Sequence, residues 1–253
     1  MALRLWRRVR LTVSDLQVLD DTEALAQAAA DRFVAASEEA IENRGRFTVA
    51  LSGGSTPQGA YSRLADPSLA TKVSWRNVEI FWGDERCVPP DHPDSNYRMV
   101  RKTLIQKVPI PQTNVHRIQG ELDPDLAAEA YEEQLRSVFG TKDRPRFDLI
   151  LLGLGKDGHT ASLFPGSQAL RETRRWVAAV FVESLEAWRV TLTPPVLNSA
   201  RQLSFLVAGK SKAKRLHEVL LGEQQPELLP AQIIQPRNGQ VSWLIDQAAA
   251  ANL

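Results

Sequence analysis

One stretch of the sequence decides the fold: Phe147-Asp148-Leu149-Ile150-Leu151-Leu152, which runs directly into Gly153-Leu154-Gly155-Lys156-Asp157-Gly158-His159-Thr160-Ala161-Ser162-Leu163-Phe164-Pro165. An unbroken apolar run that ends at glycine is typical of a central strand in a parallel sheet. Open α/β sheets bind ligands just beyond the carboxyl ends of such strands. His159 lies there, where it can act as a general base while Asp157 orients its ring.

Strand and helix patterns alternate along the rest of the chain. Apolar runs predict strands at 47–51, 78–82, 147–152, 176–182, 189–192, 203–207 and 241–245. Helical spacing predicts helices at 22–43, closed by Gly45, and near 58–65, 96–107, 126–139 and 211–220. The alternation favours one α/β domain over residues 1–253: a Rossmann-like, mostly parallel twisted sheet with helices on both faces.

Composition excludes several classes of function. Hydrophobic residues make up 43% and charged residues 24% of the 253 positions, as in ordinary soluble globular proteins. The 31 basic and 30 acidic residues leave a charge of +1, which attracts neither nucleic acid nor membrane. No segment approaches the roughly 20 apolar residues of a membrane span. The lone Cys87 excludes an internal disulfide, and we expect it to be structural in a cytoplasmic protein.

The arginine-rich start of the chain leaves one alternative open. Residues 1–11 contain four arginines, and the first acid is Asp15. Such a composition is also found in organelle transit peptides, although no long apolar centre is present to suggest secretion. We expect this segment to be a basic lead-in to the fold.

A second motif follows the strand at 47–51. Ser52-Gly53-Gly54-Ser55-Thr56 precedes Pro57, which suits the first turn of a helix. Glycines let the backbone approach an anion, the helix start offers free N–H groups, and hydroxyls add donors, so the motif predicts a phosphate cradle. The alternative is a strand-to-helix turn made merely of small residues. Because no Gly-Lys-Ser/Thr follows, the usual nucleotide-binding loop is absent.

A third motif, Gly83-Asp84-Glu85-Arg86, ends the strand at 78–82 and should therefore lie at the same sheet edge. The alternative to a role in the site is a purely structural turn, closed by an ion pair between Asp84 and Arg86. We expect Glu85 to face the protein interior.

The same loop that carries His159 also matches a dinucleotide-binding fingerprint. Gly153-x-Gly155-x-x-Gly158 has the required spacing, and Glu183 ends the next strand pattern where a ribose-binding acid is found in such proteins. The fingerprint requires its third glycine to open a long helix, yet Pro165-Gly166 interrupts the chain within two turns. We therefore expect no nicotinamide cofactor.

Together the three motifs, in this order within roughly residues 18–244, resemble the 6-phosphogluconolactonases, in a larger group that includes glucosamine-6-phosphate deaminases. The resemblance implies the sugar-phosphate isomerase/deaminase fold. It also implies hydrolysis of 6-phospho-D-glucono-1,5-lactone to 6-phospho-D-gluconate, the second step of the oxidative pentose phosphate pathway. It places a phosphate-binding lysine at Lys212, substrate contact at Arg86, and at Asp84 the carboxylate that deaminases use as a base. Arg189 is a second phosphate candidate, and solvated surface cations are the alternative for both Lys212 and Arg189.

These residues suggest a mechanism. The phosphate ligands are expected to be Ser52, Gly53, Gly54, Ser55, Thr56, Lys212 and Arg189. Arg86 would stabilise the carbonyl oxyanion, and His159 would take a proton from water and return it to the departing ring oxygen. Asp157 and Asp84 would set the position and tautomer of His159.

Other classes of activity find less support. No His, Cys and carboxylate spacing indicates a metal site, and neither Ser52 nor Ser162 has the surroundings of a nucleophile elbow. We expect no cofactor and one kind of partner, a small-molecule sugar-phosphate lactone, bound by a monomer or weak homo-oligomer. Two rivals remain: a sugar-phosphate isomerase or deaminase, and a catalytically silent sugar-phosphate-binding regulator. Phe164 disfavours the first, because the deaminase pattern Gly-His-Ile-Ala-Phe-Asn-Glu-Pro has its glutamate at that place.

Overall fold

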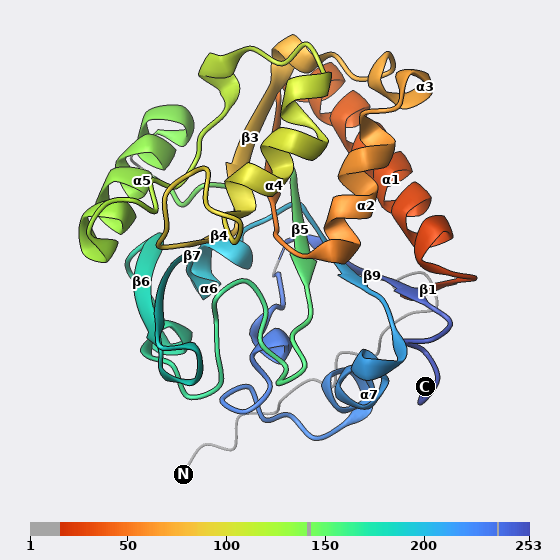
Figure 1. Ribbon diagram of the computed structural model, residues 1–253, viewed down its shortest axis with the longest axis vertical. Coiled ribbons are helices and arrows are strands. Elements are labelled where there is room, and N and C mark those ends of the chain that lie inside the picture. Colours follow the sequence, from red (N-terminus) through yellow and green to blue (C-terminus); the bar gives the residue numbers. More distant parts are fainter. Residues whose placement is uncertain (1–15, 141–142, 237) are drawn as a thin grey trace.

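The computed structural model describes residues 16–140, 143–236 and 238–253. Its larger sheet has six parallel strands in the order β1-β9-β8-β5-β2-β3 (Figure 1). These strands are β1 (Leu16–Leu19), β2 (Phe47–Leu51), β3 (Val78–Trp82), β5 (Leu149–Gly153), β8 (Gln202–Val207) and β9 (Gln240–Asp246). The apolar runs of β2 and β5 are buried, as expected for strands at the centre of a parallel sheet.

Seven α-helices lie within the described residues. They are α1 (Thr22–Arg44), α2 (Ser55–Leu64), α3 (Pro67–Ala70), α4 (Asn96–Thr103), α5 (Pro124–Phe139), α6 (Pro194–Leu197) and α7 (Ala213–Leu221). Helix α1 begins where Asp21 accepts hydrogen bonds from the N–H groups of Glu23 and Ala24, and it ends at Gly45, whose φ of 75° suits glycine. Short 3-10 helices are η2 (Trp75–Asn77), η3 (Ile105–Lys107), η4 (Gln112–Asn114), η5 (Gln168–Arg171), η6 (Glu183–Leu185), η7 (Lys210–Lys212) and η8 (Pro230–Ile233).

A second, smaller sheet adds to the predicted architecture of a mostly parallel sheet. Strands β4 (Asp84–Arg86), β7 (Ala187–Leu192) and β6 (Val177–Val182) pair antiparallel in the order β4-β7-β6, and α5 packs against β6 and β7 (Figure 1). Sequence patterns predicted β6 and β7 as strands but did not separate them from the parallel sheet. The turn between them spans only residues 183–186, which is too short for the crossover that parallel neighbours need.

The order of the strands creates a binding position. From β2 the chain moves outward to β3, whereas from β5 it moves the other way, to β8 and then β9. Because such crossovers are right-handed, the connections that follow β2 and β5 pass over opposite faces of the sheet. β2 and β5 are neighbours, so the crevice beyond their carboxyl ends is a topological switch point, where α/β proteins bind ligands.

At the opposite edge, Asp148 fixes how β2 and β5 pair. One of its carboxylate oxygens accepts hydrogen bonds from the N–H and hydroxyl of Thr48 at 2.9 and 2.8 Å, and the other accepts one from Arg44 at 2.9 Å. The register places Val49 beside Leu149 and Ala50 beside Ile150. This pairing brings the loops that follow both strands side by side.

Candidate active site

The three predicted loops meet at the carboxyl ends of the parallel strands. Gly53–Thr56 follows β2 and the glycine-rich loop 154–159 follows β5, so both lie at the switch point. Gly83, between β3 and β4, donates its N–H to the carbonyl of Leu51 and accepts from the N–H of Leu192, both at 2.8 Å. These two bonds attach the small sheet to the same edge, as the shared-edge prediction requires.

His159 is held by Asp157. The Oδ1 atom of Asp157 lies 2.6 Å from Nδ1 of the imidazole and 3.1 Å from the backbone nitrogen of His159. Burial opposes ionisation of Asp157, but the hydrogen bond and charge of His159 outweigh it and lower the pKa of Asp157 to about 2. An ionised acceptor at Nδ1 keeps the proton on that nitrogen and leaves Nε2 free to accept a proton.

Two further groups fix the imidazole ring. A Cβ atom at Gly155 would lie 2.1 Å from Nδ1 of His159, so only glycine allows the backbone to pass this close. On another side, the Phe164 ring stacks on the imidazole with 4.2 Å between centroids and 30° between planes. Gly158 opens no helix, and the next helical turn is η5, which confirms that the loop is not a dinucleotide-binding fingerprint.

The cradle has the geometry that its sequence predicts for anion binding. Gly54, with a φ of 102°, is the N-cap of α2 and makes no side-chain cap. Ser55 is exposed and Thr56 half-buried at the start of the helix, where the first N–H groups have no partner within the helix. The turn therefore presents hydroxyls and free amide groups to the crevice.

Ser52 lies deeper than the other cradle residues. It is 4% exposed, its N–H and carbonyl both bind the Tyr61 hydroxyl, and its own Oγ is buried with no hydrogen-bond partner in the described structure. Its contact with phosphate stays a prediction, as do the ligand roles of Gly53, Gly54, Ser55 and Thr56.

The small sheet carries two arginines and an acid on one face, next to each other across β4 and β7. Arg86 of β4 is the register partner of Arg189 of β7, and Asp84 is the partner of Thr191. Burial and the neighbouring Arg86 charge lower the pKa of Arg189, while Asp84 opposes this. The described ion pairs include none between Asp84 and Arg86, which disfavours the alternative of a turn closed by that pair.

Asp84 requires one correction. We expected it to share in orienting His159, but its Oδ2 atom instead accepts a hydrogen bond from the Ser162 hydroxyl at 2.7 Å. The bond to Nδ1 of His159 comes from Asp157. Asp84 is close enough to Arg189 to influence its charge, so it acts on the arginine side of the crevice.

Glu85 anchors the rim of the crevice, in agreement with the prediction that it faces the interior. It is 2% exposed, and its oxygens accept from the N–H groups of Arg86, Asn96 and Tyr97 and from the Ser95 hydroxyl. The Arg86 guanidinium donates to the carbonyl of Asp94, in the loop 87–95 between β4 and α4. The loop is therefore ordered around Arg86.

Asn96 is a site residue that sequence reasoning missed. Its Nδ2 donates to the carbonyl of Asp84 at 2.9 Å, and a Cβ at Gly53 would lie 1.9 Å from its Oδ1 atom. It thus joins the cradle to β4. Its only signal in the sequence is that it begins the helix predicted at 96–107.

Lys212 lies at the end of η7, close to Lys156 and Asp157 of the glycine-rich loop 154–159. Burial and then the nearby Lys156 charge lower the pKa of Lys212, while Asp157 opposes this. The turn that carries it starts at Gly209, whose N–H donates to both carboxylate oxygens of the buried Asp246 at 2.9 and 3.0 Å. Lys212 is half-buried, unlike the neighbouring, exposed Lys210, so it has the placement of a ligand rather than of a freely solvated cation.

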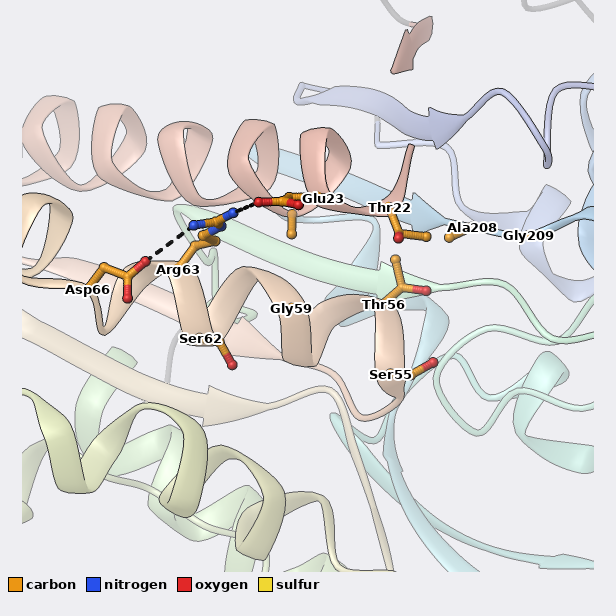
Figure 2. A pocket seen from close by; sticks show the side chains of 11 residues that line it. Thr22, Glu23, Ser55, Thr56, Gly59, Ser62, Arg63, Asp66, Ala208 and Gly209 are labelled. Carbon is orange, nitrogen blue, oxygen red and sulfur yellow. Dashed lines mark hydrogen bonds and ion pairs between the residues drawn. The ribbon is translucent and has the colours of Figure 1, made fainter. Parts of the chain in front are cut away.

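A cavity of about 630 Å³ adjoins the cradle, between the start of α1 and α2. Figure 2 shows Thr22, Thr56 and Gly209 at one end and Arg63 between Glu23 and Asp66 at the other. Arg63 is paired with both carboxylates, and neither His159 nor Arg86 lines the space. The cavity therefore adjoins the cradle, but the predicted catalytic residues His159 and Arg86 lie outside it.

Three further residues, Cys87, His116 and Glu183, have surroundings that indicate a structural rather than a functional role. Burial raises the pKa of the Cys87 thiol to about 11, which leaves it unreactive, as expected of a structural cysteine. His116 is buried, stacks on Phe81 and lies 2.6 Å from Glu79. Glu183 starts the turn between β6 and β7.

Some sequence predictions lie outside what the structure describes. The arginine-rich segment 1–11 is outside the described residues. No group of three or more His, Cys, Asp or Glu in the described ranges could hold a metal ion, and no helix there is long and apolar enough to span a membrane. The absence of metal and cofactor, the weak or absent oligomerisation and the cytoplasmic location stay predictions.

Comparison with protein families supports the resemblance. Residues 20–243 match the family described as glucosamine-6-phosphate isomerases/6-phosphogluconolactonase. The 6-phosphogluconolactonase of Synechocystis sp. is 45% identical over 218 residues, which cover 85% of this chain and 88% of that protein. A probable chloroplastic 6-phosphogluconolactonase of Oryza sativa is 36% identical, covering 94% of this chain and 76% of its own.

The fold has a close counterpart among solved structures. The 6-phosphogluconolactonase from Trypanosoma brucei superimposes with a TM-score of 0.85 and 35% identity, covering 94% of this chain and 98% of that one. The parallel sheet with a smaller antiparallel sheet is thus an arrangement that a known lactonase structure shares.

Proposed function

The chain belongs to the family of glucosamine-6-phosphate isomerases and 6-phosphogluconolactonases and is a lactone hydrolase of the pentose phosphate pathway, and from this premise we propose which of its residues carry the reaction. The substrate is 6-phospho-D-glucono-1,5-lactone and the product 6-phospho-D-gluconate. The observation that supports this assignment most is the Asp157–His159 pair, which lies at the same sheet edge as the cradle before α2.

In the proposed mechanism the phosphate is bound first. The Ser52–Thr56 turn supplies amide and hydroxyl donors, and Lys212 and Arg189 supply positive charge. A dianion held at a helix start and by lysine or arginine gains charge-assisted hydrogen bonds. This anchor leaves the lactone ring to extend toward His159 and Arg86.

The chemical step uses His159 and Arg86. Nε2 of His159 takes a proton from water as its oxygen forms a bond to C1 of the lactone. The carbonyl oxygen becomes an oxyanion, which the guanidinium of Arg86 stabilises. The oxyanion then collapses, the bond between C1 and the ring oxygen breaks, and His159 returns its proton to that oxygen. Asp157 stays ionised throughout and holds Nδ1.

The phosphate anchors should be separable from the chemistry by substitution. We expect Lys212→Ala and Ser55→Ala to raise KM by about 10- to 100-fold, because a hydrogen bond to a charged group contributes roughly 1.5–3 kcal/mol. This rise in KM should largely disappear with a lactone that lacks the phosphate. The measurement is steady-state hydrolysis of both lactones, corrected for spontaneous opening.

Lys210→Ala is the matched control for the lysine, because Lys210 lies on the same short helix and is exposed. It should leave KM within about twofold of the unmodified chain. If Lys212→Ala raised KM equally for both lactones, Lys212 would not be a ligand of the phosphate.

A further inference from the structure

One face of the small sheet carries four polar side chains next to the crevice: Asp84, Arg86, Arg189 and Thr191. Asp84 faces Thr191 and Arg86 faces Arg189 across β4 and β7. Residues two apart on a strand point to the same side, so all four share one face. This face holds Arg86, the proposed oxyanion stabiliser, whereas His159 comes from the parallel sheet.

Ser162 joins the loop of His159 to this face. Its hydroxyl donates to Oδ2 of Asp84 at 2.7 Å, and its backbone N–H donates to Oγ1 of Thr191 at 3.3 Å. Ser162, Asp84 and Thr191 are 1%, 8% and 0% exposed. Among the described residues, no other hydrogen bond connects the loop 154–166 to β4, β6 or β7.

The turn that presents Ser162 is held in an unfavourable backbone conformation. Ala161 has a φ of 48°, a region that residues with a side chain seldom occupy. The Thr160 hydroxyl donates to the carbonyl of Gly153 at 2.9 Å, and the N–H of Leu163 donates to the carbonyl of Thr160 at 2.9 Å. Such strain persists only where surrounding contacts over-determine it, and here those contacts aim Ser162 at Asp84.

We propose that Ser162 is a positioning residue for the lactonase reaction: by binding Asp84 and Thr191 it fixes His159 and Arg86 relative to each other. The inference rests on the proposed roles of His159 and Arg86. Because Ser162 is buried, it cannot reach the lactone and acts through Asp84. Its hydrogen bond fixes the position of the Asp84 carboxylate beside the two arginines.

The neighbours of Arg189 support this role for Asp84. Burial and the charge of Arg86 lower the pKa of Arg189, whereas Asp84 raises it. Two guanidinium groups side by side repel each other, so a fixed carboxylate between the loop and the arginines keeps both in place. Losing the Ser162 donor would free Asp84 to move toward either arginine.

The test is a double-mutant cycle of Ser162→Ala and Asp84→Asn, read as kcat and KM for the phosphorylated lactone. We expect Ser162→Ala to lower kcat about 10- to 100-fold, the usual effect of losing a hydrogen bond to a charged group, with KM changed less than about threefold. Because Ser162 acts through Asp84, the double variant should match Asp84→Asn within about twofold. Ser204→Ala, which removes another buried hydroxyl paired with Ser242, should leave kcat unchanged.

Circular dichroism and melting temperature establish that each variant is folded. If Ser162→Ala does not fold, Ser162→Cys replaces the hydroxyl with a somewhat larger thiol, which is only a weak donor, and should also lower kcat. An unchanged kcat in a folded Ser162 variant, or losses that multiply in the double variant, would overturn the positioning role alone. Failure of the unmodified chain to hydrolyse the lactone would overturn the proposed function together with it.

Discussion

Replacing His159 with alanine is expected to lower turnover of the phosphorylated lactone by about 10²–10⁴-fold, the usual contribution of a positioned general base. The affinity for the phosphorylated ligand should be retained, because the imidazole contacts Asp157 and Phe164 rather than any residue of the Ser52–Thr56 cradle. The measurement is kcat corrected for spontaneous hydrolysis, with the affinity for 6-phosphogluconate measured by titration calorimetry. That affinity should change less than about threefold.

His217→Ala is the matched control, because His217 lies on α7 and binds the carbonyl of Asn252. It should turn over the lactone like the unmodified chain. A His159→Ala protein that keeps at least half of the original turnover would exclude His159 as the base.

Replacing Arg86 with alanine is expected to lower kcat by about 10²–10³-fold, the usual effect of losing an oxyanion donor. The loss should be the same with phosphorylated and unphosphorylated lactones, because the developing charge is on the carbonyl and not on the phosphate. Arg86→Lys should recover part of the rate, since an ammonium group keeps the charge but not the planar fork. The measurement is kcat for both substrates.

Arg117→Gln serves as a control, because the half-buried Arg117 pairs with Glu121 at 2.6 Å and is not among the proposed site residues. It should leave kcat unchanged with either lactone. If Arg86→Ala instead raised KM for the phosphorylated lactone alone, Arg86 would belong to the phosphate site.

Local sequence patterns predicted most of the parallel sheet, because its central strands are continuous apolar runs that end at glycine or serine. Helix α1 was predicted to within one residue, since Gly45 closes it. The separate antiparallel sheet was not predicted, because the pattern of β6 and β7 does not reveal with which strands they pair. Strand β4 was missed since its three residues, Asp84–Arg86, are all charged and have no strand periodicity.

The candidate site residues could be predicted where they directly follow a strand in the sequence. His159, Asp157, Arg86 and the cradle all follow strand ends, and parallel strands bring these ends together. Contacts between distant segments could not be read from sequence. Asn96 reaches Gly53 and Ser162 reaches Asp84 only because two sheets meet at Gly83.

Phe164 connects the structure to the choice between lactone hydrolysis and amino-sugar deamination. Its ring stacks on His159, at the place where the deaminase pattern has a glutamate. A phenyl ring cannot transfer a proton. Lactone opening requires only activated water and a stabilised oxyanion, whereas amino-sugar isomerisation needs sequential proton transfers.

The most direct test of this account is to assay one preparation of the chain with 6-phospho-D-glucono-1,5-lactone and with glucosamine 6-phosphate. We expect hydrolysis of the lactone well above its spontaneous rate and no measurable release of ammonia. Deamination at a rate comparable to lactone hydrolysis, or no acceleration with either substrate, would contradict the account.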